Sequence, residues 1–510
     1  MSRAVEAARE VVERLLGLGA AEAVLAPGSR SGPLALALHA ADAQGLIRLH
    51  VRVDEREAGF LALGLAKGSG RPVPVVTTSG TAVANLHPAM LEARHARVPV
   101  IAITADRPGQ LRGTGANQTT EQRGIFPGIR FVEAAAELAG LDAPQHLNLE
   151  LDEPLVEAVE WDFSRGPFEG ARSSRRLRDR VRLGPGPLMV VVAGDGAAEG
   201  DPHPERWGYP VFAEPSSGLR DENAIAAYRL LLGGHPLAER IERVVCLGHP
   251  TLSRPVSGLL ARADLDIVHV GDKSTFPGEA AHVRFVESVE VTGTGDPAWL
   301  AAWRRADRRA RAAIRAQASD PLRLAATVWQ AAAGGTLVVG SSSVVRDLDL
   351  IAAGAPPARV IANRGLAGID GMLSTAIGAA LAAGRPAFAL VGDLTFCHGA
   401  NGLLIGPGEP RPDLTIVVAS DDGGAIFSLL EQGDPAYADA FERIYATPTG
   451  TDLAALCRAH GVPHRRVAVA DLPAALDRPR GLSVVEVPLD RRTRRSDARR
   501  LAAAVRETYP

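Results

Sequence analysis

The stretch PVPVVTTSGTAVANLHPAMLEARHARVPVIAIT (residues 72–104) contains two apolar runs separated by a helical pattern. The runs at 72–78 and 98–104 hold no charged residue and are rich in Val and Ile. Such runs are typical of strands buried on both faces of a parallel sheet. Residues 80–96 between them have the length of a helix that crosses over to the next strand. This order predicts one strand–helix–strand unit of a parallel sheet.

The same alternation surrounds this stretch throughout the first third of the chain. Apolar runs at 21–27 and 48–53 alternate with helical patterns at 31–42 and 56–68. Repeated units of this kind predict a doubly wound α/β sheet.

Two further α/β regions follow, with apolar runs that begin at LMVVVAG (188–194) and GTLVVG (335–340). Residues 161–187 are rich in Arg, Gly, Ser and Pro and predict a linker, and a long helix is expected at 299–318. The predicted fold is therefore three consecutive α/β domains with mainly parallel, doubly wound sheets. The expected bounds are 1–182 for the first domain with its C-terminal linker, 183–318 for the central domain and 319–510 for the third domain.

Composition narrows the class of protein. Of the 510 residues 23% are charged and the formal net charge is −3, which argues against a general nucleic-acid-binding surface. No apolar run reaches the length of a membrane span, and the first residues do not have the pattern of a signal peptide. The three cysteines lie far apart, so we expect the protein in a reducing cytoplasm.

Polar residues follow the predicted strands of the first domain, where open parallel sheets bind their ligands. Ser29 and Arg30 follow the first strand and are suited to a carboxylate or phosphate. Glu55 follows the second strand, either as a first-turn carboxylate that favours the helix dipole or as a buried proton-handling group.

The third and fourth strands of this domain are also followed by polar segments. Ser79, Gly80 and Thr81 open a helix and either bind an anion or cap the helix. A long polar loop then carries Arg107 together with Asn117 and Gln118, and long loops at strand ends are often functional.

The third domain places two aspartates at the ends of neighbouring predicted strands. Asp393 and Asp421 can together hold a hard divalent cation against a diphosphate. Gly423 and Gly424 allow a close approach of the backbone and supply a carbonyl oxygen. The alternative for a single Gly-Asp at a strand end is an ordinary turn.

Arginines at several strand ends indicate the charge of the substrate. Arg346 and Arg364 each follow a predicted strand of the third domain, as Arg30 and Arg107 do in the first domain. The planar guanidinium group binds carboxylates through two parallel hydrogen bonds. The set predicts a site for substrates with several carboxylates.

These motifs together resemble a known family. The pair GD and DDGG is similar to the motif with which thiamine diphosphate enzymes hold Mg²⁺. In addition, PGSRSGPLALAL, DEREAGFLALGLAK, TSGTAVANLHPA, TADRP, TGANQ, NRGLAGIDGMLSTA and DDGGAIFSLL resemble the 2-succinyl-5-enolpyruvyl-6-hydroxy-3-cyclohexene-1-carboxylate synthases of menaquinone biosynthesis. The resemblance is dense at both ends of the chain and thin in the middle.

The resemblance implies a fold, a reaction and an assembly. It implies a pyrimidine-binding first domain, a central domain and a third domain that binds diphosphate and metal. The family reaction decarboxylates 2-oxoglutarate and adds the succinyl carbanion equivalent to isochorismate by conjugate addition. The implied cofactors are thiamine diphosphate and Mg²⁺ or Mn²⁺. The implied assembly is a homodimer with active sites at the subunit interface, extended to a dimer of dimers.

The resemblance also implies residue roles. Glu55 is expected to activate the cofactor through its aminopyrimidine ring, and Ile369 to support the bent form of the cofactor. The expected metal ligands are Asp393, Asp421 and the carbonyl group of Gly423. Further cofactor contacts are expected from Ser79, Gly80, Thr81, Gly392, Leu394, Gly424, Ile426 and Phe427. Substrate contacts are expected from Ser29, Arg30, Arg107, Asn117, Gln118, Arg254, Ser342, Arg346 and Arg364.

The chain departs from the common pattern at several positions, and two rival functions remain. Asp421 stands where the superfamily usually has Asn, and Ser253 stands where many family members have a basic residue. The nearest rival is another thiamine diphosphate decarboxylase or carboligase of the acetohydroxyacid synthase type, which needs fewer cationic groups. A non-catalytic nucleotide-binding or scaffolding protein would need neither Glu55 nor the aspartate pair.

Overall fold

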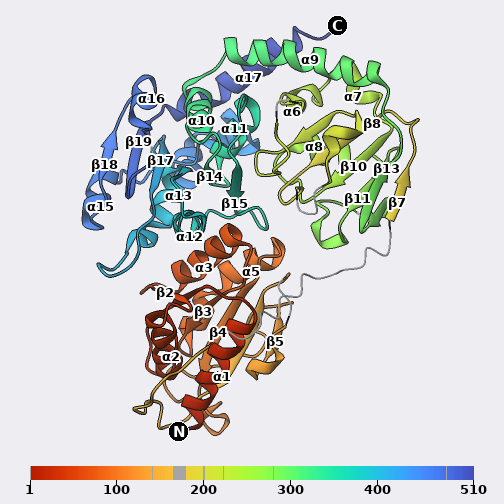
Figure 1. Cartoon of the computed structure of the whole chain (residues 1–510). Helices are drawn as coiled ribbons and strands as arrows, with labels where there is room; N and C mark the ends of the chain where they lie inside the picture. The colour runs from red at the N-terminus through yellow and green to blue at the C-terminus, as the bar shows by residue number, and fades with distance from the viewer. Residues whose placement is uncertain are drawn as a thin grey trace.

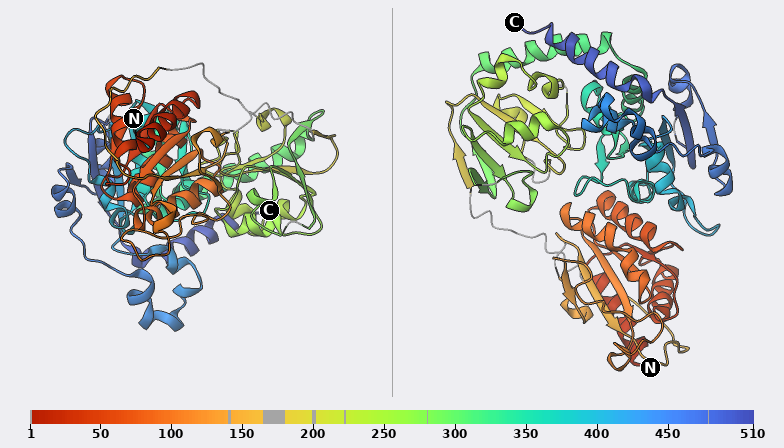
Figure 2. Two further views of the ribbon diagram at one scale, coloured as in Figure 1. Left: turned by 90° about the horizontal axis from the view of Figure 1, so that it is seen from below. Right: turned by 180° about the vertical axis from the view of Figure 1, so that it is seen from behind.

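The computed structural model describes residues 2–139, 142–164, 180–198, 202–221, 223–279, 281–477 and 479–510. Their strands form four parallel sheets in three bodies (Figure 1). The body nearest the N-terminus lies below, and the other two lie side by side above it, as the view from behind also shows (Figure 2). Parallel sheets with interleaved helices confirm the predicted doubly wound α/β class.

The first sheet has six strands. In their order across the sheet they are β2 (Arg48–Val51), β1 (Glu22–Leu25), β3 (Val73–Thr77), β4 (Val100–Asp106), β6 (Gln145–Glu150) and β5 (Arg130–Val132). Helices α1 (Arg3–Gly17) and α2 (Gly32–Ala43) share a core with one face, and α3 (Glu55–Ser69) and α5 (His87–His95) with the other. The single helix predicted at 80–96 is divided into α4 (Thr81–Asn85) and α5, which has Pro88 in its first turn, where proline is tolerated.

The third sheet also has six strands. In order they are β15 (Arg359–Ala362), β14 (Thr336–Val339), β16 (Ala387–Gly392), β17 (Leu414–Ser420), β19 (Leu482–Pro488) and β18 (His464–Arg466). Helices α10 (Asp320–Ala331) and α11 (Ser343–Ile351) share a core with one face, and α12 (Met372–Ala383) packs on the other. Shorter helices of this body are α13 (Asp393–His398), α14 (Ala438–Phe441), α15 (Leu453–Ala459) and α16 (Leu472–Ala475).

Helices α3 and α12 join the first and third sheets through one continuous core. Both helices are apolar around most of their circumference, as expected for helices buried on all sides. A Cβ atom on Gly64 would lie 2.2 Å from the carbonyl oxygen of Thr375, and one on Gly378 would lie 2.4 Å from that of Leu61. The two backbones therefore touch, and only glycine fits at these crossing points.

The central sheet lies beside the third one (Figure 1). Its order is β12 (Val283–Val286), β11 (Asp266–Val270), β10 (Arg243–Leu247), β8 (Met189–Ala193) and β9 (Val211–Ala213). Its helices are α6 (Tyr228–Leu231), α7 (Pro236–Glu239) and α8 (Arg254–Leu260). The long helix predicted at 299–318 is α9 (Pro297–Ala316), which packs against α17 (Arg494–Arg506).

The segment predicted to be a linker contains one strand. β7 (Arg180–Leu183) pairs in parallel with β13 (Ser288–Val291), so this part is ordered by a long-range partner that composition does not reveal. Residues 165–179 of the predicted linker lie outside the described residues. Because β7 crosses the expected boundary at 182, the domain bounds stay predictions. Along the described ranges, no helix is both long and apolar enough to cross a membrane.

Candidate active site

A cavity of about 330 Å³ lies at the carboxyl edge of the third sheet. It brings together all of the predicted third-domain residues except Arg364. Those that line it are Ser342, Arg346, Ile369, Gly392, Asp393, Leu394, Asp421, Gly423, Gly424, Ile426 and Phe427. Every lining residue of this chain comes from 321–494, so the described first-sheet residues do not contribute to it.

Two carboxyl groups stand at the base of this cavity. Asp393 begins α13 directly after β16, and Asp421 follows β17, the neighbouring strand. Asp393 accepts hydrogen bonds from the backbone N–H groups of Leu394 (2.6 Å) and Gly423 (3.2 Å). Burial raises the pKa of Asp393, and burial followed by the nearby Asp393 charge raises the pKa of Asp421 to about 7. A proton or a cation is needed to hold these two groups together.

The residues present fit a divalent cation that is completed by a ligand. The Asp421 carboxylate has no hydrogen-bond partner among the described residues, so its oxygens are available for coordination. No group of three or more His, Cys, Asp and Glu side chains in the described ranges could hold a metal ion alone. Two carboxylates, a backbone carbonyl and diphosphate oxygens together give the oxygen-rich shell that Mg²⁺ prefers.

The segment after Asp421 is held close to the cavity. The N–H group of Gly424 donates to the carbonyl oxygen of Ala446 (2.7 Å), in the π-helical turn η9 (Glu442–Ala446). A Cβ atom on Gly423 would lie 2.6 Å from the same oxygen, and its φ of +150° favours glycine. The close approach expected of Gly423 and Gly424 is therefore made to the chain's own backbone.

The first-sheet candidates lie at the carboxyl edge of their own sheet. Arg30 is buried and donates to the carbonyl oxygen of Leu151 (2.8 Å). Burial, and then the nearby Arg107 charge, lower the pKa of Arg30. Arg107 donates to the carbonyl oxygen of Asn117 (3.2 Å). Two guanidinium groups close together favour an anionic ligand between them.

Glu55 and Glu57 lie in the first turn of α3, where Asp54 caps the helix. The Glu55 carboxylate accepts a hydrogen bond from Asn85 Nδ2 (3.1 Å). Glu57 is almost completely buried and accepts from Ser374 Oγ of α12 (2.6 Å). Burial raises the pKa of Glu57 to about 7. The strongly perturbed carboxyl of this turn is thus Glu57, at the junction of the two sheets.

Two of the predicted substrate-binding arginines form hydrogen bonds with other residues of the same chain. Arg254, at the start of α8, forms two hydrogen bonds with the Glu431 carboxylate (2.6 and 2.9 Å) on the exposed surface. Arg364 is buried and donates to Thr251 Oγ1 of the central body (2.7 Å). Neither residue lines the cavity, so their substrate roles stay predictions.

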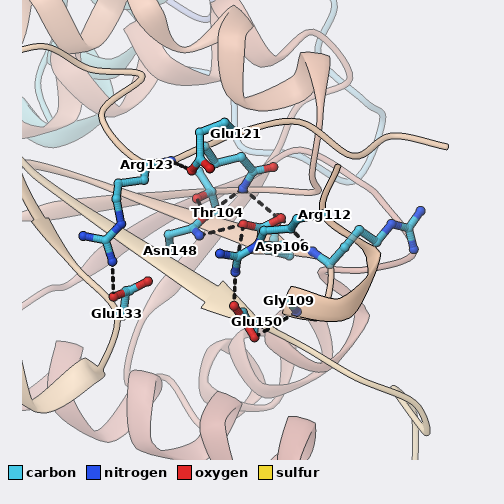
Figure 3. Close-up of polar contacts among 12 residues, drawn as sticks. Thr104, Asp106, Gly109, Arg112, Glu121, Arg123, Glu133, Asn148 and Glu150 are labelled. Atoms are coloured by element: carbon cyan, nitrogen blue, oxygen red, sulfur yellow. Dashed lines mark hydrogen bonds and ion pairs between the residues drawn. The ribbon is translucent and has the colours of Figure 1, made fainter. Parts of the chain in front are cut away.

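Three buried polar residues that the sequence did not single out connect the segments of Arg107 and Gly80, and Figure 3 labels two of them, Asp106 and Asn148. They are Asp106, Gln122 and Asn148, all almost fully buried and bonded to one another in a chain. The position of Asp106 at the end of a predicted strand could have identified it from the sequence. No local sequence pattern identifies Gln122 and Asn148, because their burial depends on a loop and a strand that meet only in the folded chain.

Comparisons with known proteins agree with this arrangement at both sheets. Residues 5–125 match the family described as thiamine pyrophosphate enzyme, N-terminal TPP binding domain. Residues 340–487 match the family described as thiamine pyrophosphate enzyme, C-terminal TPP binding domain. The first match contains Arg30, Glu55 and Arg107, and the second contains Asp393 and Asp421.

Several curated relatives match nearly the whole chain. A protein of Nocardioides sp. is 50% identical, and the alignment covers 98% of both chains. Proteins of Saccharopolyspora erythraea (43%) and Rhodococcus erythropolis (44%) are each aligned over 99% of both chains. All three are named 2-succinyl-5-enolpyruvyl-6-hydroxy-3-cyclohexene-1-carboxylate synthase.

Proposed function

The chain belongs to the 2-succinyl-5-enolpyruvyl-6-hydroxy-3-cyclohexene-1-carboxylate synthase family, and from this premise we propose its reaction and its residue roles. It is a thiamine diphosphate-dependent enzyme of menaquinone biosynthesis. Its reaction is the decarboxylation of 2-oxoglutarate and the conjugate addition of the succinyl unit to isochorismate. The observation that carries this proposal is the 50% identity over 98% of both chains. The same relatives favour it over an acetohydroxyacid synthase-like activity.

When bound, thiamine diphosphate supplies the nucleophilic carbon and the electron sink for decarboxylation. We propose that Asp393, Asp421 and the Gly423 carbonyl group hold the divalent cation, Mg²⁺ or Mn²⁺, that binds the diphosphate. The support is the pair of neighbouring buried carboxyl groups, whose pKa values are raised although the charges of Arg494 and Arg491 act to lower the pKa of Asp421. Ile369 lines the same cavity and supports the cofactor from its apolar side.

Residues of the first sheet handle the reacting end of the cofactor and the substrates in this proposal. Glu55 exchanges a proton with the aminopyrimidine ring. Arg30 and Arg107 hold substrate carboxylates, as their proximity at the sheet edge favours. Arg346, which lines the third-sheet cavity, holds another carboxylate. Binding the carboxylates on opposite sides would orient the two substrates for bond formation.

We propose that a second copy of the chain completes each site. In one chain, the cavity at Asp393 and Asp421 receives no described residue from the first sheet. Val53, two residues before Glu55, is 70% exposed, and Leu366 and Leu404 are also well exposed. A homodimer, or a dimer of dimers, would bring a Glu55 edge to each cavity and cover apolar surface. The proposed location is the cytoplasm, which the three unpaired cysteines favour.

The test is consumption of isochorismate, followed by its absorbance. Purified protein is incubated with thiamine diphosphate, Mg²⁺, 2-oxoglutarate and isochorismate, and each component is omitted in turn. Consumption that requires 2-oxoglutarate and cofactor is the expected result. Carbon dioxide release from pyruvate, without isochorismate consumption from 2-oxoglutarate, would contradict the proposed reaction and favour the carboligase rival.

A further inference from the structure

Gln122 occupies a buried position between two polar segments of the first sheet's carboxyl edge. Its side chain is 0% exposed. Nε2 donates to Asn148 Oδ1 (2.6 Å) and to the carbonyl oxygen of Ala105 (3.2 Å). Oε1 accepts from the backbone N–H group of Gly80 (3.0 Å). All three contacts are within the chain, so Gln122 has no surface with which to touch a substrate.

The contacts continue from Asn148 into the sheet. Asn148 lies on β6, where its Nδ2 donates to Asp106 Oδ2 (2.8 Å) and its Oδ1 accepts from Thr104 Oγ1 (2.7 Å). Figure 3 shows these three side chains together. The other oxygen of Asp106 accepts from the backbone N–H group of Arg107 (2.7 Å). The chain of bonds therefore runs from the residue before Arg107 to the turn at Gly80.

The orientation of every amide in this chain of bonds is determined. The N–H group of Gly80 can only donate and the carbonyl oxygen of Ala105 can only accept, so Gln122 must present Oε1 to Gly80 and Nε2 to Ala105 and Asn148. Asn148 must then present Oδ1 to Gln122, which leaves Nδ2 for Asp106. Bonds that are all satisfied in a buried environment reinforce one another and hold one geometry.

The two segments that Gln122 joins are in direct contact. Gly80 has a φ of +81°, and a Cβ atom there would lie 3.2 Å from both Cα and the carbonyl oxygen of Gln118. Gln118 itself has a φ of +52°, in the left-handed region. The placement of Gln118 thus depends on how the loop is held against the turn.

We propose that Gln122 is a positioning residue that fixes Gln118 and the Ser79–Thr81 turn relative to each other for the reaction. The inference rests on the proposed function and on two expectations from the sequence, that Gln118 contacts substrate and that Ser79, Gly80 and Thr81 contact the cofactor. Gln122 acts only through them. Its three hydrogen bonds connect the loop to Asn148 and, through Asn148, to Asp106. Asp106 also accepts a hydrogen bond from the backbone N–H group of Arg107, so the loop and Arg107 are held by the same chain of bonds.

The test compares Gln122→Met with Gln44→Met. Methionine preserves size and removes the hydrogen bonds. Gln44 is a control outside the site, because its exposed side chain also joins two segments, through the backbone of Trp161 and Phe163, at the end of α2. We expect Gln122→Met to lower kcat about tenfold, because small displacements of positioned groups reduce rates strongly. KM for thiamine diphosphate should stay within about twofold, since the third sheet holds the diphosphate. Gln44→Met should change neither.

A double-mutant cycle shows whether Gln122 acts through Gln118. Gln122→Met should have much less effect on kcat in a Gln118→Ala background than in the wild type. Additive effects, or equal effects of Gln122→Met and Gln44→Met on kcat, would overturn the proposal and leave Gln122 with a structural role.

Hydrogen exchange tests the same inference without any activity. In Gln122→Met, the peptide that contains Gly80 and the 115–123 peptide should exchange faster, while the α2 peptide is unchanged. If Gln122→Met does not fold, Thr104→Val weakens the same chain of bonds with little change in shape, and the same two peptides should respond. Unchanged exchange at Gly80 in the folded variant would overturn the proposal. Faster exchange in a protein that does not consume isochorismate would instead contradict only the proposed function.

Discussion

The first and third sheets have the same topology. Their strand orders, β2-β1-β3-β4-β6-β5 and β15-β14-β16-β17-β19-β18, correspond strand for strand. In each, the fourth strand leads to an aspartate at the carboxyl edge. Asp106 accepts hydrogen bonds from Asn148 and from the backbone of Arg107. Asp421 has no such donor, and burial raises its pKa to about 7.

The difference shows how one topology serves two purposes. The strand order determines where polar residues gather, at the carboxyl edge of each sheet. The partners of those residues determine what the edge can do. In the first sheet the buried carboxylate is satisfied by the chain and supports a loop. In the third sheet the corresponding carboxylate is unsatisfied and is suited to a cation.

The strongest predicted loss of activity concerns the residues that follow the third strand of each of the two six-stranded sheets. Asp393 directly follows β16, and Ser79 is the second residue after β3, the corresponding strand of the first sheet. Because losing a residue that only orients a metal ligand lowers metal affinity or activity about 10–100-fold, Asp393→Ala should lower activity about a thousandfold. Its binding of thiamine diphosphate with Mg²⁺, measured by calorimetry, should be lost. Ser79→Ala should lower activity less than about tenfold.

Equal losses of activity in Asp393→Ala and Ser79→Ala would contradict this difference between the two sheets. Retained cofactor binding in Asp393→Ala would exclude Asp393 as a ligand of the cation.

The junction of the two sheets gives a pH-dependent effect. Burial raises the pKa of Glu57 from 4.5 to about 7, so the folded state favours its protonated form. The resulting stabilisation is present below about pH 4.5 and is lost as the pH rises through about 7. Glu57→Gln keeps a neutral side chain and should be more stable than the wild type by about 3 kcal/mol at pH 8.5.

Urea unfolding at pH 5.5 and pH 8.5 measures this difference. The advantage of Glu57→Gln should increase with pH. A constant difference between the two pH values would show that Glu57 is ionised in the folded protein.

The weakest predicted effect is on KM, and it concerns the contacts that hold the segment after the fourth strand of each six-stranded sheet. The loop after β4 is held by buried amide groups as well as by ion pairs such as Arg112–Glu150, whereas the segment after β17 reaches the central body through the exposed Arg254–Glu431 pair. Exposed ion pairs contribute little to stability. Glu431→Gln should therefore leave Tm unchanged. It should lower KM for 2-oxoglutarate about twofold, because Arg254 becomes free for a substrate carboxylate.

High salt should reduce that difference in KM, since it screens the Arg254–Glu431 pair of the wild type, which the variant lacks. An unchanged KM at low salt would remove Arg254 from the substrate site.

Much of this arrangement could be predicted from local sequence. The buried strands β3, β4, β16 and β17 are continuous apolar runs, and parallel sheets place their ends together. The aspartates at 393 and 421 were therefore expected to be neighbours, and they line one cavity.

Other features depend on contacts that are distant in sequence. β5, β7 and β18 have only three or four residues and carry charged side chains, so they lack the apolar signal of a strand. The Arg254–Glu431 pair and the burial of Arg364 against Thr251 follow from the packing of the central body on the third. Gln122 became buried only because its loop folds back over β4 and β6.

We propose that the two edges act together, with the first sheet of one chain and the third sheet of another forming each site. Glu55→Gln and Asp393→Ala chains carry their changes on different edges. Each variant alone should be nearly inactive. The measurement is the rate of isochorismate consumption after the two variants, with different tags, are co-expressed and the mixed dimer is purified.

In a mixed dimer, one of the two sites would contain both an intact Glu55 and an intact Asp393. We expect about half of the wild-type rate for the purified mixed dimer, because a twofold assembly has two equivalent sites. A mixed dimer no more active than either variant alone would show instead that each site is built within one chain.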